Sequence, residues 1–221
     1  INSLLKHDFN EKINFFQSFK LFRQKQSGQN IYSQINEFSS HTKFNQLLKN
    51  DWSLDYEFYL TDFRNDDRLN NDDSIYGFYD HTLIKPELRI SNQKRKNTVF
   101  GIAMENELLK RSLFEDNVRS NLINAFLQYD FTIKDKLLMI LGTRLDNHSN
   151  YKSKLSSKLS FKYYYNDNIS STFSVGQGFK SPDFRQLYLN FTNSSVGYSV
   201  LGKFEELKGI NKLCLLYTSD A

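Results

Sequence analysis

The 221-residue sequence is poor in the residues and segments that mark several common protein classes. It has a single cysteine, Cys214, so no disulfide can form within the chain. It has only nine glycines and two prolines, which excludes collagen-like and proline-rich disordered chains. No run approaches the roughly 18 apolar residues that a membrane-spanning helix needs. A membrane crossing by β-strands stays open, because a barrel strand needs only about 9–11 residues.

The usual signatures of enzymes and of metal or nucleic-acid binding are also missing. The four histidines are His7, His41, His81 and His148. They lie far apart with no partner at position i+4, so no metal cluster is expected. The pair Gly176 and Gly178 lacks a third glycine, which argues against a dinucleotide site. No nucleophile–base pattern is present, so neither enzyme activity nor a cofactor is expected. The net charge is only +4, and the tight basic run at 94–96 is interpreted as a solvated turn rather than a nucleic-acid contact.

The sequence is instead rich in aromatic residues, at 15%, and in a two-residue alternation of apolar and polar side chains. Residues 154–165 show it best: odd positions are mainly Leu, Phe and Tyr, and even positions include Lys154, Lys158 and Lys162. Successive side chains of a strand point to opposite faces, so this segment predicts a strand with one apolar and one cationic face.

The alternation recurs along most of the chain. Strands are predicted at 13–21, 52–61, 100–108, 123–134, 137–146 and 169–179, whereas 33–47 matches the pattern poorly. Short turns are predicted near 8–11, 48–50, 92–96, 135–136 and 166–168, and longer polar loops near 25–32, 64–79, 111–120, 148–153 and after 180. Alternating short and long connections are typical of outer-membrane barrels. The fold class is therefore all-β, an antiparallel transmembrane β-barrel fragment of about ten strands.

Lipid explains why such strands would form a barrel. Every backbone N–H and C=O group in hydrocarbon needs a hydrogen-bond partner, so spanning strands must close into a cylinder. The apolar faces would contact outer-membrane lipid and the lysines would face the lumen. A lysine on the lipid side at mid-bilayer would cost about 2–4 kcal/mol, which fixes the register of each strand.

From residue 142 onward, several motifs occur in a distinctive order. A G-x-R-x-D strand is followed by the strand Ser156-Ser157-Lys158, then by G-x-G-F-K-S-P and finally by L-Y. The motif residues are Gly142, Arg144, Asp146, Gly176, Gly178, Phe179, Pro182, Leu187 and Tyr188. This succession resembles the barrel of TonB-dependent receptors, although the proline of the family's S-P-K element is absent. Residues 190–202 resemble a Bacteroidetes-type branch, and residues 101–114 resemble the family's G-x-E strand.

The resemblance implies a piece of a larger barrel of about 22 strands with a plugged lumen. It implies a receptor in the outer membrane of a Gram-negative bacterium that imports a small molecule or metal chelate. A ferric siderophore or related iron complex is the default substrate. The partner would be the TonB complex, reached through an N-terminal region and plug domain that this chain lacks.

Candidate substrate-binding residues lie on the polar face and in the predicted loops. They are Arg144, Asp146, His148, Tyr151, Lys180, Asp183 and Arg185. One interpretation is contact with an anionic metal complex. The favoured alternative is an Arg–Asp ladder that ties neighbouring strands and plug together, and haem ligation by His148 is a further alternative.

The two ends of the sequence also carry expectations. The chain begins at Ile1 without methionine or a signal peptide, as a truncated chain would. Residues 213–221 break the strand pattern and resemble translated sequencing-adapter read-through. We therefore expect residues 1–212 to be a partial barrel domain and residues 213–221 to be a non-native tail.

Two other functions remain open at this point. A passive, porin-like outer-membrane channel would share the strand pattern and would lack the plug. A soluble, secreted β-rich binding protein would instead bury its apolar face against a second layer. Long strands and scarce glycine and proline weigh against the soluble protein.

Overall fold

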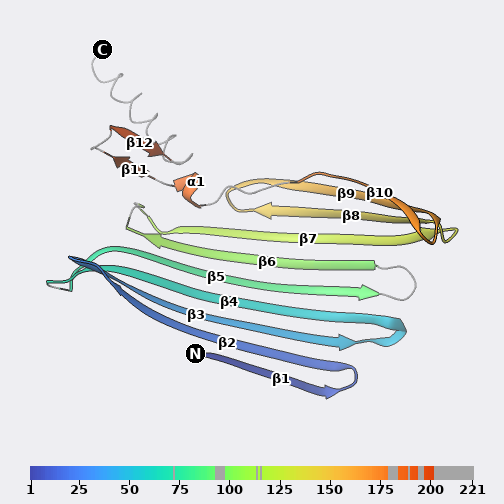
Figure 1. Cartoon of the computed structure of the whole chain (residues 1–221), viewed down its shortest axis with the longest axis horizontal. Helices are drawn as coiled ribbons and strands as arrows, with labels where there is room; N and C mark the ends of the chain where they lie inside the picture. The colour runs from blue at the N-terminus through green and yellow to red at the C-terminus, as the bar shows by residue number, and fades with distance from the viewer. Residues whose placement is uncertain are drawn as a thin grey trace, which may run out of the picture.

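A computed structural model of the chain describes residues 1–71, 73–92, 98–112, 114, 116–178, 184–188, 190–193 and 197–201. Ten long strands form a single antiparallel sheet in which each strand pairs with its neighbours in sequence (Figure 1). The strands are β1 (Asn2–Asn10), β2 (Ile13–Ser27), β3 (Ile31–Leu47), β4 (Trp52–Leu69), β5 (Ile75–Asn92), β6 (Thr98–Arg111), β7 (Val118–Ile133), β8 (Leu137–His148), β9 (Tyr151–Asn166) and β10 (Ile169–Gly176). A 3-10 turn, η1 (Lys49–Asp51), joins β3 to β4. The all-β fold of about ten antiparallel strands is confirmed.

Three short elements follow the sheet. They are α1 (Phe184–Tyr188), β11 (Asn190–Asn193) and β12 (Tyr198–Leu201), and the two strands form a separate hairpin. The rings of Tyr188 in α1 and Phe114 after β6 lie 6.3 Å apart, which brings α1 to the end of the sheet where β6 connects to β7 (Figure 1). Within the described residues, no helix has the length and apolarity to cross a membrane.

The strand register separates an apolar face from a polar face. Leu145 pairs with Ala125 on β7 and with Leu155 on β9, while the neighbouring position Arg144 pairs with Phe126 and Ser156. The apolar face is uncovered: Ile123, Leu145 and Leu155 are 50%, 48% and 56% exposed. No second sheet or helix packs on it in the described part of the chain, so the two-layered soluble fold does not apply.

The polar face carries most of the buried side chains. These are Ser53, Ser91, Ala103, Leu109, Val118, Ser120, Asn124 and Ser160. Hydroxyl pairs bridge adjacent strands there, Ser53 to Ser91 at 2.7 Å and Ser160 to Ser174 at 2.6 Å. Crowding on one face of a single sheet without a covering layer indicates that the sheet curves toward that face, as a barrel wall curves toward its lumen.

The apolar face is apolar over only part of each strand. On β4 its residues are Trp52, Leu54, Tyr56, Phe58 and Leu60, followed by Asp62, Arg64, Asp66 and Arg68. We call the first part the apolar band, and the end of the sheet beside it the band end. The opposite end, where β2–β3, β4–β5, β6–β7 and β8–β9 connect, is the distal end. The band covers nine residues of β4, close to the length that a membrane strand needs.

The long loops predicted at the distal end are largely wrong. β4 continues to Leu69 and β5 begins at Ile75, so most of the predicted loop at 64–79 is paired strand. The strands likewise extend into the loops predicted at 25–32, 111–120 and 148–153. On β4, both faces carry charged or amide side chains from Arg64 to Arg68, so the alternation disappears there although the backbone ladder continues. Cross-strand partners such as Arg64 opposite Asp80 replace the apolar contacts.

Candidate functional site

A hollow of about 270 Å³ lies on the polar face near the distal end of β7–β9. It is lined by Leu122, Arg144, Asp146, His148, Lys152, Ser156 and Gln177. Three of the predicted site residues, Arg144, Asp146 and His148, therefore meet here. The alternation of β8 explains this, because positions 144, 146 and 148 point to the same side of the sheet.

Arg144 and Asp146 form an ion pair along β8. The Arg144 Nε lies 2.7 Å from the Asp146 carboxylate, and the two side chains are 49% and 13% exposed. This pair does not form the predicted Arg–Asp ladder between strands, because both residues belong to β8. Asp146 stands opposite Asn124 and Lys154 in the register. The pair fixes the guanidinium while leaving it accessible from the hollow.

His148 is held by hydrogen bonds at both ring nitrogens. The Asn150 backbone N–H donates to Nδ1 at 3.0 Å, so the ring proton lies on Nε2, 2.9 Å from the Ser120 hydroxyl. The Tyr151 ring stacks on the imidazole with centroids 4.0 Å apart. His148 lies beyond the apolar band, and its burial holds its pKa below the usual value. With both nitrogens engaged, His148 shapes the β8–β9 turn and has no free nitrogen for haem iron.

The remaining candidates follow β10. Lys180 and Asp183, with the motif residues Phe179 and Pro182, lie outside the described residues. Arg185 belongs to α1, as do the motif residues Leu187 and Tyr188. Leu187 is almost fully buried, at 2% exposure, so it anchors α1.

A column of lysines runs down the polar face of β9 from this hollow. Its members are Lys154, Lys158 and Lys162, and Lys152 continues it into the hollow. The sequence pattern placed the three on one face but did not nominate them as a site. The strand register draws attention to them, because it pairs Lys158 with Gly142 on β8 and Gly176 on β10. Neither neighbour has a side chain that could cover the lysine.

The polar face of β2–β6 is arranged differently. Most of its charged side chains form cross-strand or same-strand ion pairs: Lys20–Glu37 at 2.8 Å, His41–Glu57 at 2.5 Å, Lys43–Glu57 at 3.3 Å, Lys85–Glu105 at 3.4 Å, His81–Glu107 at 3.6 Å and Arg89–Glu87 at 2.5 Å. We call this surface the paired wall. Its cations and anions neutralise one another without a ligand.

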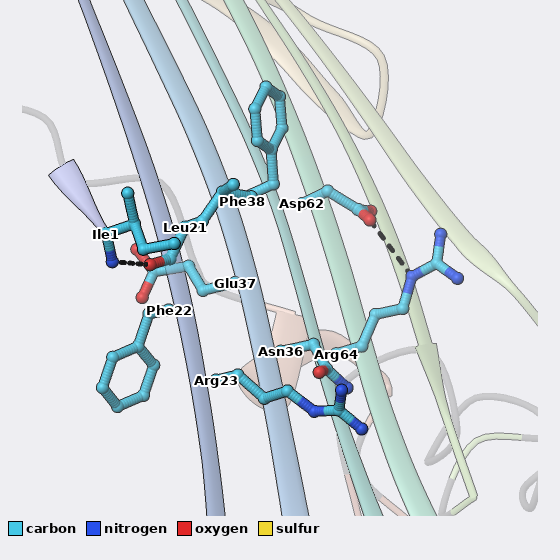
Figure 2. A pocket seen from close by; sticks show the side chains of 9 residues that line it. All are labelled: Ile1, Leu21, Phe22, Arg23, Asn36, Glu37, Phe38, Asp62 and Arg64. Carbon is cyan, nitrogen blue, oxygen red and sulfur yellow. Dashed lines mark hydrogen bonds and ion pairs between the residues drawn. The ribbon is translucent and has the colours of Figure 1, made fainter. Parts of the chain in front are cut away.

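A larger hollow of about 650 Å³ lies on the other side of the sheet, at the border of the apolar band (Figure 2). Leu21 and Phe38 line its apolar part, and Arg23 and Arg64 line its polar part. Arg64 pairs with Asp62 at 3.1 Å. These side chains point away from the lysine column, so the hollow is separate from the candidate site and marks where the apolar band ends.

Metal coordination by the protein is not supported in the described part of the chain. No group of three or more His, Cys, Asp or Glu residues is placed there to hold an ion. The site offers electrostatic chemistry: the guanidinium of Arg144, held by Asp146, and exposed lysine ammonium groups above serine hydroxyls and glycine backbone.

Comparisons with known proteins agree with this architecture. Residues 2–212 match the family model described as TonB dependent receptor-like, beta-barrel. The crystal structure of the siderophore receptor PirA from Pseudomonas aeruginosa is similar at a TM-score of 0.71 and 13% identity, over 91% of this chain and 39% of that one. The alcaligin outer membrane receptor FauA from Bordetella pertussis is similar at 0.60 and 16%, over 75% and 32%. The ferric enterobactin receptor PfeA from P. aeruginosa, in complex with enterobactin, is similar at 0.62 and 11%, over 84% and 34%. No curated protein matches the sequence. The chain thus spans about two fifths or less of these solved structures, and at these identities the likeness concerns the fold.

Proposed function

Because the chain belongs to the TonB-dependent receptor β-barrel family, we propose that it forms part of the wall of an outer-membrane receptor that imports a ferric siderophore or related iron complex. The observation that carries the proposal is the uncovered apolar band on a single curved sheet. Siderophore receptors among the similar solved structures support the choice of substrate class. The family is one of transport receptors rather than enzymes.

The apolar band suggests how the wall sits in the membrane. The band would lie in the hydrocarbon, since the backbones of β2–β9 are paired with a neighbouring strand on both sides there. The band end, where the strands stop at the edge of the apolar band, would face the periplasm, because the parts of outer-membrane barrels that extend beyond the bilayer lie mainly outside the cell. The distal end would project outside the cell, and the polar face would line the lumen.

In this arrangement the hollow at Arg144 and Lys152 lies at the mouth of the lumen. Both cations would attract the carboxylate or catecholate oxygens of an iron chelate, and the Asp146 carboxylate would keep the guanidinium of Arg144 in place. We propose that a plug domain fills the lumen below and that the TonB complex drives its rearrangement. No bond of the substrate is made or broken, so the wall acts by binding and guiding.

Growth and uptake assays test this function. A strain lacking the complete receptor would be supplied with single ferric siderophores and assayed for growth and for radioiron uptake. Uptake should depend on the receptor, on TonB and on the proton gradient. Equal uptake without TonB or after addition of a protonophore would replace the proposal with the passive channel.

A further inference from the structure

The lysine column of β9 stands apart from the other charged groups of the polar face. Lys154, Lys158 and Lys162 are spaced four residues apart, so they face the same side. At a rise of about 3.3 Å per residue, they span roughly 26 Å along the strand. With the strand tilt of about 40° that is usual in membrane barrels, this covers about 20 Å of a hydrocarbon core about 30 Å deep.

Among the described residues, none of these lysines forms an ion pair. Asp146 stands opposite Lys154 in the register, but its carboxylate pairs with Arg144. Lys158 has no carboxylate within reach. Lys162 lies 4.8 Å from the ring of Tyr164, which leaves its charge uncompensated by an acid. Most cations of the paired wall have an acid partner that the column lacks; Arg111 instead lies over the ring of Tyr79.

The surroundings of Lys158 keep its ammonium group accessible. Its cross-strand neighbours are Gly142 on β8 and Gly176 on β10, so no side chain covers it from either flank. A Cβ on Gly176 would lie 3.6 Å from the Lys158 side chain, an ordinary contact, so packing alone does not require glycine there. The adjacent rows hold Ser156 and Ser160, small hydroxyl side chains that can donate hydrogen bonds.

We propose that the lysine column is a guiding track for the anionic groups of the imported chelate, leading from the hollow at Arg144 and Lys152 toward the band end. The inference rests on the proposed function and adds to it a path and a charge class: the cargo carries carboxylate, catecholate or phosphate oxygens. A row of like charges along a water-filled passage between the wall and the plug, with low-dielectric protein on both sides, raises the local concentration of counter-ions. Spacing the cations evenly lets a bound anion move to the next site without leaving the row.

The test uses the complete receptor in cells. Lys158→Gln and the triple variant Lys154→Gln, Lys158→Gln and Lys162→Gln would be compared with Lys85→Gln, a lysine of the paired wall. Radioiron uptake would be measured with an anionic ferric chelate and with an uncharged one, together with surface binding at low temperature. We expect the triple variant to take up the anionic chelate roughly tenfold more slowly, with the uncharged chelate and surface binding unchanged. Lys85→Gln should behave as wild type with both chelates.

Each other outcome overturns the track. Equal loss of anionic and uncharged uptake, or increased sensitivity to large antibiotics, would assign the column to an acidic surface of the plug. Unchanged anionic uptake in the triple variant would leave the column without a transport role. If the wild-type receptor imports no iron chelate, the proposed function fails, and that result is distinguishable because it appears before any lysine is changed.

Discussion

The paired wall of β2–β6 and the lysine column of β9 lie on the same face of one sheet but arrange charge in opposite ways. In the paired wall, most acids have a cation beside them, as Glu57 has His41 and Lys43, and the others accept hydrogen bonds, as Asp55 does from Asn45. In the column, the cross-strand neighbours of Lys158 are glycines, which have no side chain. A surface that neutralises its own charges is complete without a ligand, whereas an uncompensated row of one sign implies a partner of the other sign. This difference is the reason for placing the proposed track on β8–β10.

The largest expected effect comes from moving a lysine to the other face of β9. Leu159→Lys would put an ammonium group in the middle of the apolar band, beside the column but on the wrong side. The free energy of unfolding of the complete receptor in lipid vesicles should fall by about 2–4 kcal/mol. Denaturant titration measures it, with Ser157→Lys nearer the edge of the band as a milder comparison. A loss below about 0.5 kcal/mol would contradict the lipid-facing assignment.

The next largest effect on stability is expected where β6, at the edge of the paired wall, packs against β7; we call this contact the seam. Gly101 on β6 lies under the ring of Phe126 on β7, and a Cβ at position 101 would clash with that ring. Gly101→Ala should therefore displace Phe126 and cost about 1–3 kcal/mol in the same titration. Gly142→Ala is the matched control, because its Cβ would make an ordinary 3.8 Å contact with Lys158. Equal stability of the two variants would show that the seam is loosely packed.

Removing one charge from each region separates them further. Glu57→Gln takes away the acid shared by His41 and Lys43, and should cost about 0.5–1 kcal/mol because the pairs are partly exposed. Lys158→Gln should leave stability unchanged, since no ion pair is lost. Denaturant titrations at low and high salt measure both, and the Glu57 effect should shrink with salt. A larger cost for Lys158→Gln would mean that the column has a structural partner.

The smallest effect concerns pH at the head of the column. The pKa of His148 is held below its usual value by burial, so protonation is easier in the unfolded turn than in the folded one. The β8–β9 turn should thus lose stability as pH falls below about 6.5, and regain it above, by at most about 1 kcal/mol. Hydrogen exchange of the Asn150 amide, which donates to His148, measures this. The Tyr164 amide, bonded to the Lys136 carbonyl, serves as the control, and equal pH dependence of the two amides would refute the effect.

The strands were predictable where hydrophobic alternation persists, as on β7–β10. The pattern was poor over 33–47 because Ser40 and Thr42 occupy apolar-face positions of β3. Both hydrogen-bond to Gln17 on β2, so polar groups replace apolar ones in pairs. No single segment reveals such compensation, since the partner lies on another strand. The strand extensions beyond the apolar band were missed for the same reason, because their charged side chains face opposite charges on neighbouring strands.

The candidate site was predictable in part. The pattern of β8 placed Arg144, Asp146 and His148 on one face, and the structure brings them to one hollow. The role of His148 was not predictable, because its partner Ser120 comes from β7 through the register. The isolation of Lys158 likewise depends on two glycines from different strands.

In the proposed orientation, the strands that continue past the apolar band determine what the cell presents to its surroundings. Their backbones stay hydrogen-bonded up to connections as short as residues 28–30 and 149–150. A protease needs an extended, unpaired segment of chain, so digestion of intact cells should spare these ribbons. An antibody or phage protein would contact rigid paired strands, and its epitope would combine residues from adjacent strands. Short linear peptides from this region would therefore make poor immunogens.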